Sequence, residues 1–159
     1  MNCCAESDTL TVELPQQAYS RRACLTCNGP SHPVSLRTMV LMLKPELLDQ
    51  VEDRQYRFCG SPQCLVVYFS PERCYSTGDL RTRVGLKEKD DPLPVCYCFG
   101  FDVQALREEI KVKGFTTIPR RVSALVKARL CACEERNPSG ACCLGELTKV
   151  VKSLMQEAR

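Results

Sequence analysis

Cysteine is the feature that most constrains this chain, because 13 of its 159 residues are cysteine and most of them stand in short groups. A short secreted chain with this content would be a disulfide scaffold. The N-terminal residues have neither the basic nor the apolar stretch of a secretory signal, so we expect a cytoplasmic protein whose thiols stay reduced. In that setting, clustered cysteines more often hold metal ions or carry out redox chemistry.

Composition excludes several other classes of protein. Apolar residues make up 44% and charged residues 26% of the chain, as in ordinary globular proteins. The longest apolar runs, 40–43 and 65–69, are far shorter than the ~20 residues that cross a bilayer, so we expect no membrane insertion. The sequence contains no phosphate-binding glycine loop, nucleophile elbow or His-rich catalytic metal site, so we expect no enzyme activity.

A charged, proline-marked stretch at residues 87–94 divides the chain into two halves. Residues 1–21 are polar and predict an N-terminal tail. Residues 22–94 predict a small β-rich domain, and residues 95–159 predict a small helical domain. The expected fold class is therefore α+β.

The hydrophobic pattern changes its period between the two domains. In the first domain it predicts strands over 34–43, 65–69 and 82–86, with a short helix over 45–51. In the second domain apolar residues recur at helical spacing, which predicts helices over 102–113, 119–130 and 144–158. The cysteines of this domain then precede the first helix, follow the second or begin the third.

Four cysteines of the first domain form two metal-binding knuckles, Cys24-x2-Cys27 and Cys59-x4-Cys64, whose spacings are typical of zinc sites. Four thiolates complete a tetrahedral zinc and leave no open position, so a structural zinc is expected rather than a catalytic one. The alternatives are buried thiols without metal, or replacement of one cysteine by His32. We expect His32, the only histidine, to be a surface or loop residue instead.

The cysteines of the second domain predict another metal centre. Cys96 and Cys98 stand one residue apart before the first helix, and the segment 131–143 supplies further thiols between the other two helices. Cysteine thiolates in sets of four hold 2Fe-2S clusters. A second structural zinc is the main alternative, because spacing alone does not separate zinc from iron when every ligand is sulfur. A redox disulfide between Cys96 and Cys98 is less favoured.

These motifs together resemble the N-terminal domain of CopZ-type copper chaperones over about residues 22–155. The resemblance rests on the two knuckles and on the segments 65–69, 80–88, 94–98 and 137–143. It implies a zinc-binding half fused to a 2Fe-2S half similar to bacterioferritin-associated ferredoxins. It implies zinc ligands at Cys24, Cys27, Cys59 and Cys64 and cluster ligands at Cys96, Cys98, Cys133 and Cys143.

The sequence departs from this family in two ways. Nine residues separate Cys133 from Cys143, where the small ferredoxin-like domains have Cys-x2-Cys, so Cys131 and Cys142 stay open as alternative ligands. The chaperones also carry a C-terminal domain that delivers copper, and residues 1–159 contain no such segment. Soft thiolates select ions such as copper(I).

Among the remaining cysteines, the adjacent Cys3 and Cys4 are the visible candidates for carrying copper(I) or mercury(II), with inert tail residues as the alternative. We expect Cys74 to be a partly buried apolar residue.

The sequence thus favours a metallochaperone-like protein in copper or mercury trafficking, with a redox-active 2Fe-2S cluster and a metal-transport or redox protein as partner. The alternative is a small 2Fe-2S electron-transfer protein with a structural zinc domain. A nucleic-acid binder is less favoured, because the net charge is only +3, although Arg120, Arg121, Lys127 and Arg129 form a basic stripe on a predicted helix.

Overall fold

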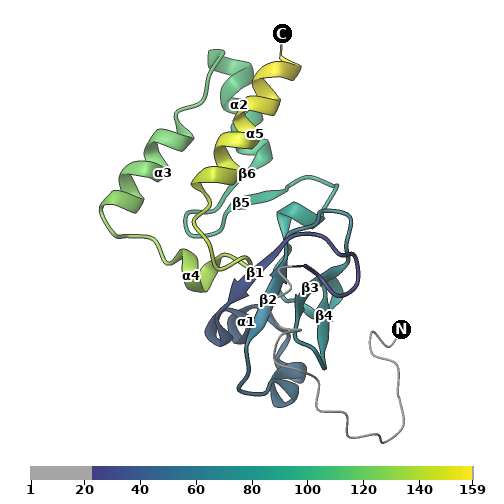
Figure 1. The fold of residues 1–159 in the computed structure, drawn as a ribbon. Helices are drawn as coiled ribbons and strands as arrows, with labels where there is room; N and C mark the ends of the chain where they lie inside the picture. The colour runs from purple at the N-terminus through teal and green to yellow at the C-terminus, as the bar shows by residue number, and fades with distance from the viewer. Residues whose placement is uncertain (1–22, 159) are drawn as a thin grey trace, which may run out of the picture.

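The structure is a computed structural model that describes residues 23–158, and its first part is built on an antiparallel sheet (Figure 1). The strands lie in the order β1 (Ser31–Val34), β2 (Tyr56–Cys59), β3 (Val66–Phe69) and β4 (Cys74–Ser76). Between and after them come α1 (Leu36–Met42) and the short 3-10 helices η2 (Pro45–Gln50), η3 (Thr77–Asp79) and η4 (Gly85–Lys87).

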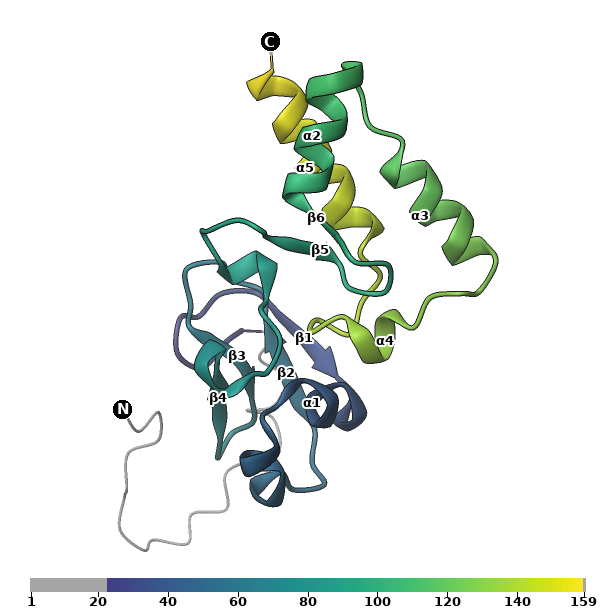
Figure 2. The same ribbon diagram turned by 180° about the vertical axis from the view of Figure 1, so that it is seen from behind.

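The second part is mainly helical and begins with a two-stranded hairpin. The hairpin strands are β5 (Pro94–Cys96) and β6 (Phe101–Asp102), and the helices are α2 (Val103–Lys113), α3 (Ile118–Lys127), α4 (Cys133–Arg136) and α5 (Leu144–Glu157). Helices α2 and α3 both pack against α5. The short α4 leaves this helical group and lies beside α1 of the first part (Figure 2). A sheet with several helices confirms the expected α+β class.

The prediction of a strand over 34–43 is wrong, because the chain turns into helix α1 after Val34. The Ser35 side chain accepts a hydrogen bond from the Thr38 amide, which is the N-cap arrangement that starts a helix. Met39 and Met42 then face the core one turn apart. The β-branched residues of this run favour strand locally, but the cap and the burial of the two methionines determine the helix.

The prediction of a strand over 82–86 is also wrong. This segment has no strand partner among the described residues and runs into η4. Val84 is nevertheless buried in the core of the first part, so the apolar residues reach the core without pairing. The close approach of Gly85 to the Pro94 carbonyl, where a Cβ would overlap the oxygen, joins this segment to β5 instead.

The remaining predicted elements are confirmed with small changes at their ends. The strand at 65–69 is β3, and the helix at 45–51 is the 3-10 helix η2. Asp102 caps α2 by accepting from the Ala105 amide, and Gly114 ends α2 in the left-handed conformation at φ 78°. Helix α3 ends at Lys127, earlier than expected. Sequence patterns did not predict the β5–β6 hairpin or α4, which are too short to show periodicity.

Each part has a hydrophobic core of its own. The first core draws on residues 34–86 and includes the fully buried Met39, Tyr56 and Tyr68, whereas the second draws on residues 93–155 and is centred on Leu106 and Leu147. A third, smaller cluster surrounds the cysteines of the two knuckles. Among residues 23–158, no helix combines the length and apolar character that a membrane span requires.

Candidate metal centre

The first knuckle is a tight turn that points two thiols in one direction. The Cys24 amide donates to the Gly29 carbonyl and the Asn28 amide donates to the Cys24 carbonyl, both at 2.8 Å. Asn28 takes a positive φ of 56°, a conformation that asparagine tolerates better than most residues. The Gly29 amide donates to the Cys27 sulfur at 3.4 Å.

The second knuckle follows directly from β2. Cys59 is the last residue of that strand, and the Cys64 amide donates to the Ser61 carbonyl at 3.3 Å. The Gly60 amide donates to the Pro30 carbonyl at 2.8 Å, which joins the second knuckle to the chain leaving the first. The ends of β1 and β2 therefore bring together two knuckles that have 31 residues between them in the sequence.

The four knuckle sulfurs form a compact group that fits a zinc ion. Their Sγ atoms all lie within 4.8 Å of one another, and those of Cys27 and Cys59 are 3.7 Å apart. Tetrahedral zinc with Zn–S bonds near 2.3 Å requires sulfurs about 3.8 Å apart. Cys27 is exposed, whereas Cys24, Cys59 and Cys64 are buried. The donor set and its spacing are those of a closed structural zinc site.

The thiols of this group ionise unequally. Burial raises the pKa of Cys59 to about 12 and also raises the pKa of Cys64. Burial acts in the same sense on Cys27, but hydrogen bonds from the Gly29 amide and from the neighbouring thiols outweigh it and lower the Cys27 pKa to about 7. Zinc uptake must therefore displace protons from Cys59 and Cys64, which makes metal binding pH-dependent.

Lys87 is not one of the cysteine ligands, but it supports the second knuckle by hydrogen bonds to its backbone. The sequence does not predict this role. The Lys87 Nζ donates to the carbonyls of Ser61 at 2.9 Å and Cys64 at 3.0 Å and lies 5.7 Å from the centre of the Phe58 ring. The Lys87 charge also favours the thiolate form of Cys59. Its position within the charged stretch 87–94 gave no signal of this role.

His32 does not join the zinc group. It lies in β1 opposite Phe58, with the two ring centroids 5.3 Å apart, so it is a half-buried strand residue and not the surface or loop residue expected. Its Nε2 is 2.8 Å from the carbonyl oxygen of Ser139 in the second part. The structure thus assigns the histidine to a contact between the two parts.

The second set of cysteines gathers as two pairs. Cys98 donates to Cys133 with the sulfurs 3.7 Å apart, and the thiols of Cys96 and Cys143 are hydrogen-bonded to each other. The Ala132 amide donates to the Cys98 sulfur at 3.4 Å. Within residues 23–158, the zinc group is the only set of three or more ligand atoms lying within 4.8 Å of one another, so the two pairs do not form one compact tetrahedron.

Ionisation is also unequal in the second set. The hydrogen bond from Cys143 lowers the pKa of Cys96 to about 6, against the effect of burial. The same hydrogen bond, together with burial, raises the pKa of Cys143. Burial raises the pKa of Cys133 to about 12. One thiol of the Cys96–Cys143 pair is thus disposed to be a thiolate that the other stabilises.

The other predicted residues lie outside these two sets. Cys131 is half-buried and Cys142 is exposed, each one or two residues from a paired cysteine. Cys74 is half-buried and packs on the cluster around the knuckles, as expected. Cys3 and Cys4 lie outside the described residues.

The basic stripe expected on α3 is only partly a free charged surface. Arg120, Arg121, Lys127 and Arg129 are all exposed, although Arg129 lies beyond the end of α3. The Arg121 guanidinium also lies over the Phe101 ring, 5.3 Å from its centroid.

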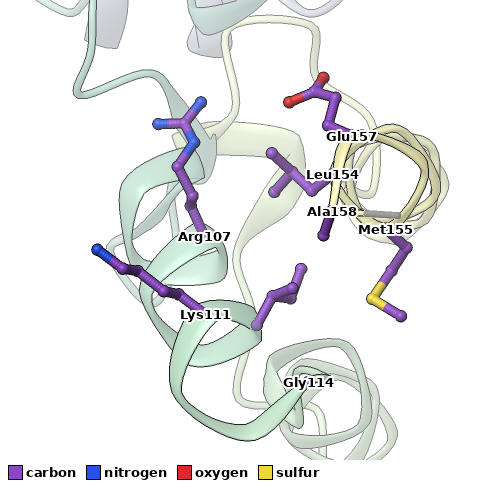
Figure 3. Close-up of a pocket in the computed structure, with 8 residues that line it drawn as sticks. Arg107, Lys111, Gly114, Leu154, Met155, Glu157 and Ala158 are labelled. Atoms are coloured by element: carbon purple, nitrogen blue, oxygen red, sulfur yellow. The ribbon is translucent and has the colours of Figure 1, made fainter.

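A pocket of about 590 Å³ lies between the C-terminal ends of α2 and α5 (Figure 3). Arg107 and Lys111 line it from α2, and Leu154 and Met155 line it from α5. Cys143 lies at the opposite end of α5, so this pocket is separate from the paired cysteines.

Comparison with known proteins assigns the first part. The zinc-binding domain family of CopZ matches residues 21–81. The copper chaperone CopZ of Archaeoglobus fulgidus is 32% identical over 127 residues, which are 80% of this chain and 60% of that protein. The X-ray structure of the N-terminal domain of Archaeoglobus fulgidus CopZ superposes with a TM-score of 0.69 at 30% identity, covering 80% of this chain and 96% of that domain.

These similarities include the compact four-cysteine group, since all four of its residues lie within the matched range. The chain therefore belongs to the family of the CopZ N-terminal domain and carries a CopZ-type zinc-binding domain with a four-cysteine cluster.

Proposed function

We propose that the protein is a cytoplasmic metallochaperone-like accessory in soft-metal trafficking, with a structural zinc site and a separate 2Fe-2S site. The observation that carries the proposal is the contrast between the two cysteine sets. One set has four sulfurs within 4.8 Å of one another, and the other is arranged as two hydrogen-bonded pairs. We assign residues 1–21 to a tail, 22–94 to the zinc domain and 95–159 to the cluster domain.

The compact set suits a single ion that holds the fold together. Cys24, Cys27, Cys59 and Cys64 would saturate zinc, so no position is left for a substrate. Among residues 23–158, the small cluster around these cysteines contains only Val66 and Phe69 as further buried residues. A metal ion therefore supplies stability that this apolar contact area does not.

The paired set suits a two-iron cluster better than a second zinc. Each iron of a 2Fe-2S cluster takes two protein ligands, so two thiol pairs match its needs. We assign Cys98 and Cys133 to one iron and Cys96 and Cys143 to the other, with Cys131 and Cys142 as alternates. When bound, such a cluster supplies one-electron oxidation and reduction. The Ala132 amide on the Cys98 sulfur would stabilise its negative charge.

Copper is the favoured cargo, and mercury is a second soft ion of the same chemistry. The name of the Archaeoglobus relative records a copper chaperone, although this chain spans only 60% of that protein. Cys3 and Cys4 are adjacent thiols outside both sets, and soft thiolates select copper(I). We propose that they carry the ion by ligand exchange to a transport protein, without a catalysed reaction.

A small electron carrier is the second candidate. Cys98 is half-buried while its partner Cys133 and both members of the other pair are buried, so the Cys98 side is where a redox partner would approach most closely. In this reading the zinc domain is structural and Cys3 and Cys4 have no role.

A copper(I) competition titration separates the two candidates. The anaerobically purified protein is titrated with copper(I) against a chromophoric chelator, beside a Cys3→Ser/Cys4→Ser variant and a Cys74→Ser control. The chaperone function predicts copper(I) binding in the wild type and the control, and its loss in the double variant, with zinc and iron retained. Equal copper(I) binding by the double variant would contradict the carrier role of Cys3 and Cys4. No binding by the wild type, with a reversible one-electron reduction, would favour the electron carrier.

A further inference from the structure

We infer that three side chains of the zinc domain, His32, Thr38 and Tyr68, are positioning residues for the cysteine loop, the segment from Cys133 to Cys143 that begins with the short helix α4. Each donates a hydrogen bond to a backbone carbonyl of that loop. The part of the inference that concerns the cluster rests on the proposed function, whereas the holding of the loop does not.

Tyr68 makes the most deeply buried of these contacts. Its hydroxyl donates to the Pro138 carbonyl at 2.6 Å, and both residues are fully buried. Tyr68 lies on β3 with its ring edge against Phe58, 6.1 Å between centroids. Burial raises the pKa of Tyr68, so the hydroxyl stays a donor throughout the physiological range. The core of the zinc domain thus extends a fixed donor to the middle of the loop.

Thr38 and His32 hold the loop on either side of that contact. The Thr38 hydroxyl donates to the Glu134 carbonyl, near Cys133. His32 Nε2 donates to the Ser139 carbonyl at 2.8 Å, toward Cys143. The three donors therefore lie on α1, β1 and β3, each of which contributes buried residues to the core of the zinc domain.

The loop lies directly on the zinc domain. Gly140 takes a positive φ of 65°, and a Cβ built there would lie 3.4 Å from the Val34 side chain and 3.7 Å from the Thr38 hydroxyl. Asn137 is buried and stiffens the loop from within, because its side chain donates to the Ala141 carbonyl at 2.8 Å and accepts from the Ser139 amide at 3.0 Å. The loop is therefore held both by its own hydrogen bonds and by its contact with the zinc domain.

The same strands carry the zinc site on their other side. In the pairing of β1 with β2, His32 lies opposite Phe58, and the next pair joins Ser31 to Cys59. Successive strand residues point to opposite faces, so the zinc ligand Cys59 and the ring of Phe58 face different sides of the sheet. Zinc on one face would thus stabilise the strands that hold the cysteine loop on the other.

Tyr68→Phe tests the inference, with Tyr75→Phe as a matched control. Tyr75 is also a buried tyrosine of the zinc domain, but its hydroxyl donates to the Gln50 carbonyl at 3.4 Å, within the same domain. Both variants remove one buried hydroxyl, and only one of them touches the loop.

The first readout is amide hydrogen exchange in the full chain loaded with zinc alone. We expect residues 134–142 to exchange about tenfold faster in Tyr68→Phe than in wild type. The exchange of the same residues should be unchanged in Tyr75→Phe. Equal loop exchange in Tyr68→Phe and wild type, or equal acceleration in both variants, would overturn the inference. Thr38→Val provides a second test near Cys133 should Tyr68→Phe fail to fold.

The second readout uses the anaerobically purified protein with its iron. Tyr68→Phe should release iron to a chelator about tenfold faster than wild type and change the midpoint potential, whereas Tyr75→Phe should change neither. Unchanged iron release and potential in Tyr68→Phe would show that the loop contacts do not act on the cluster. A wild-type protein without iron or sulfide would refute the proposed function, while hydrogen exchange would still decide whether the loop is held.

Discussion

Replacing a single zinc ligand by serine gives the sharpest test of the knuckle assignment. Cys59 is fully buried and its sulfur lies 3.7 Å from that of Cys27, so Cys59→Ser removes one thiolate and leaves a hydroxyl of similar size. The free energy of structural zinc binding to small peptides is about 10–16 kcal/mol. Divided equally among four thiolates, this gives about 2.5–4 kcal/mol for each ligand. That corresponds to a roughly 10²- to 10³-fold loss in zinc affinity.

The assay is a zinc competition titration against a chromophoric chelator, followed by thermal unfolding of the zinc-loaded protein. Cys74→Ser is the control, because Cys74 packs on the same small cluster but does not belong to the compact group of sulfurs. We expect its zinc affinity to stay close to that of wild type. Retention of wild-type affinity by Cys59→Ser, or an equal loss in Cys74→Ser, would refute the assignment.

Three further predictions concern contacts outside the sulfurs. Lys87→Met should weaken zinc binding about 10- to 100-fold while leaving the number of bound zinc ions unchanged, which the same titration measures. Gly85→Ala should lower the free energy of unfolding by about 1–3 kcal/mol in a denaturant titration, because its Cβ would overlap a backbone carbonyl of β5. Glu109 accepts hydrogen bonds, first from Thr116, that lower its pKa to about 2. The stability that this carboxylate contributes is therefore present above its pKa in the unfolded chain, ~4.3, and is lost as the pH falls toward 2. Glu109→Gln should make the free energy of unfolding less dependent on pH in this acid range. Glu108→Gln, on the exposed side of α2, should not have this effect.

The sequence predicts most of what depends on local pattern. The caps at Asp102 and Gly114 bound α2 because the capping side chain and the left-handed glycine act on their nearest neighbours. The knuckles at Cys24 and Cys59 are visible because the spacing of two ligands in one turn is itself a local property. The sequence wrongly predicts a strand where α1 lies, because the β-branched residues of this run favour a strand and make the cap at Ser35 hard to recognise.

What the sequence does not predict depends on contacts between distant residues. Nothing in the spacing of Lys87 shows that its ammonium group reaches the carbonyls of the second knuckle. His32 is 107 residues from Ser139, and Tyr68 is 70 residues from Pro138, so their hydrogen bonds follow only from the way the two parts pack. The pairing of Cys98 with Cys133 is likewise a product of tertiary structure.

Metal and sulfide analysis of the anaerobically purified protein tests the central claim most directly. The account of two distinct sites predicts about one zinc, about two iron and about two acid-labile sulfide per chain, with a visible spectrum that dithionite bleaches. Cys96→Ser should lose the iron, the sulfide and the colour while keeping the zinc. About two zinc per chain without sulfide or colour, or the loss of zinc together with iron in Cys96→Ser, would contradict it.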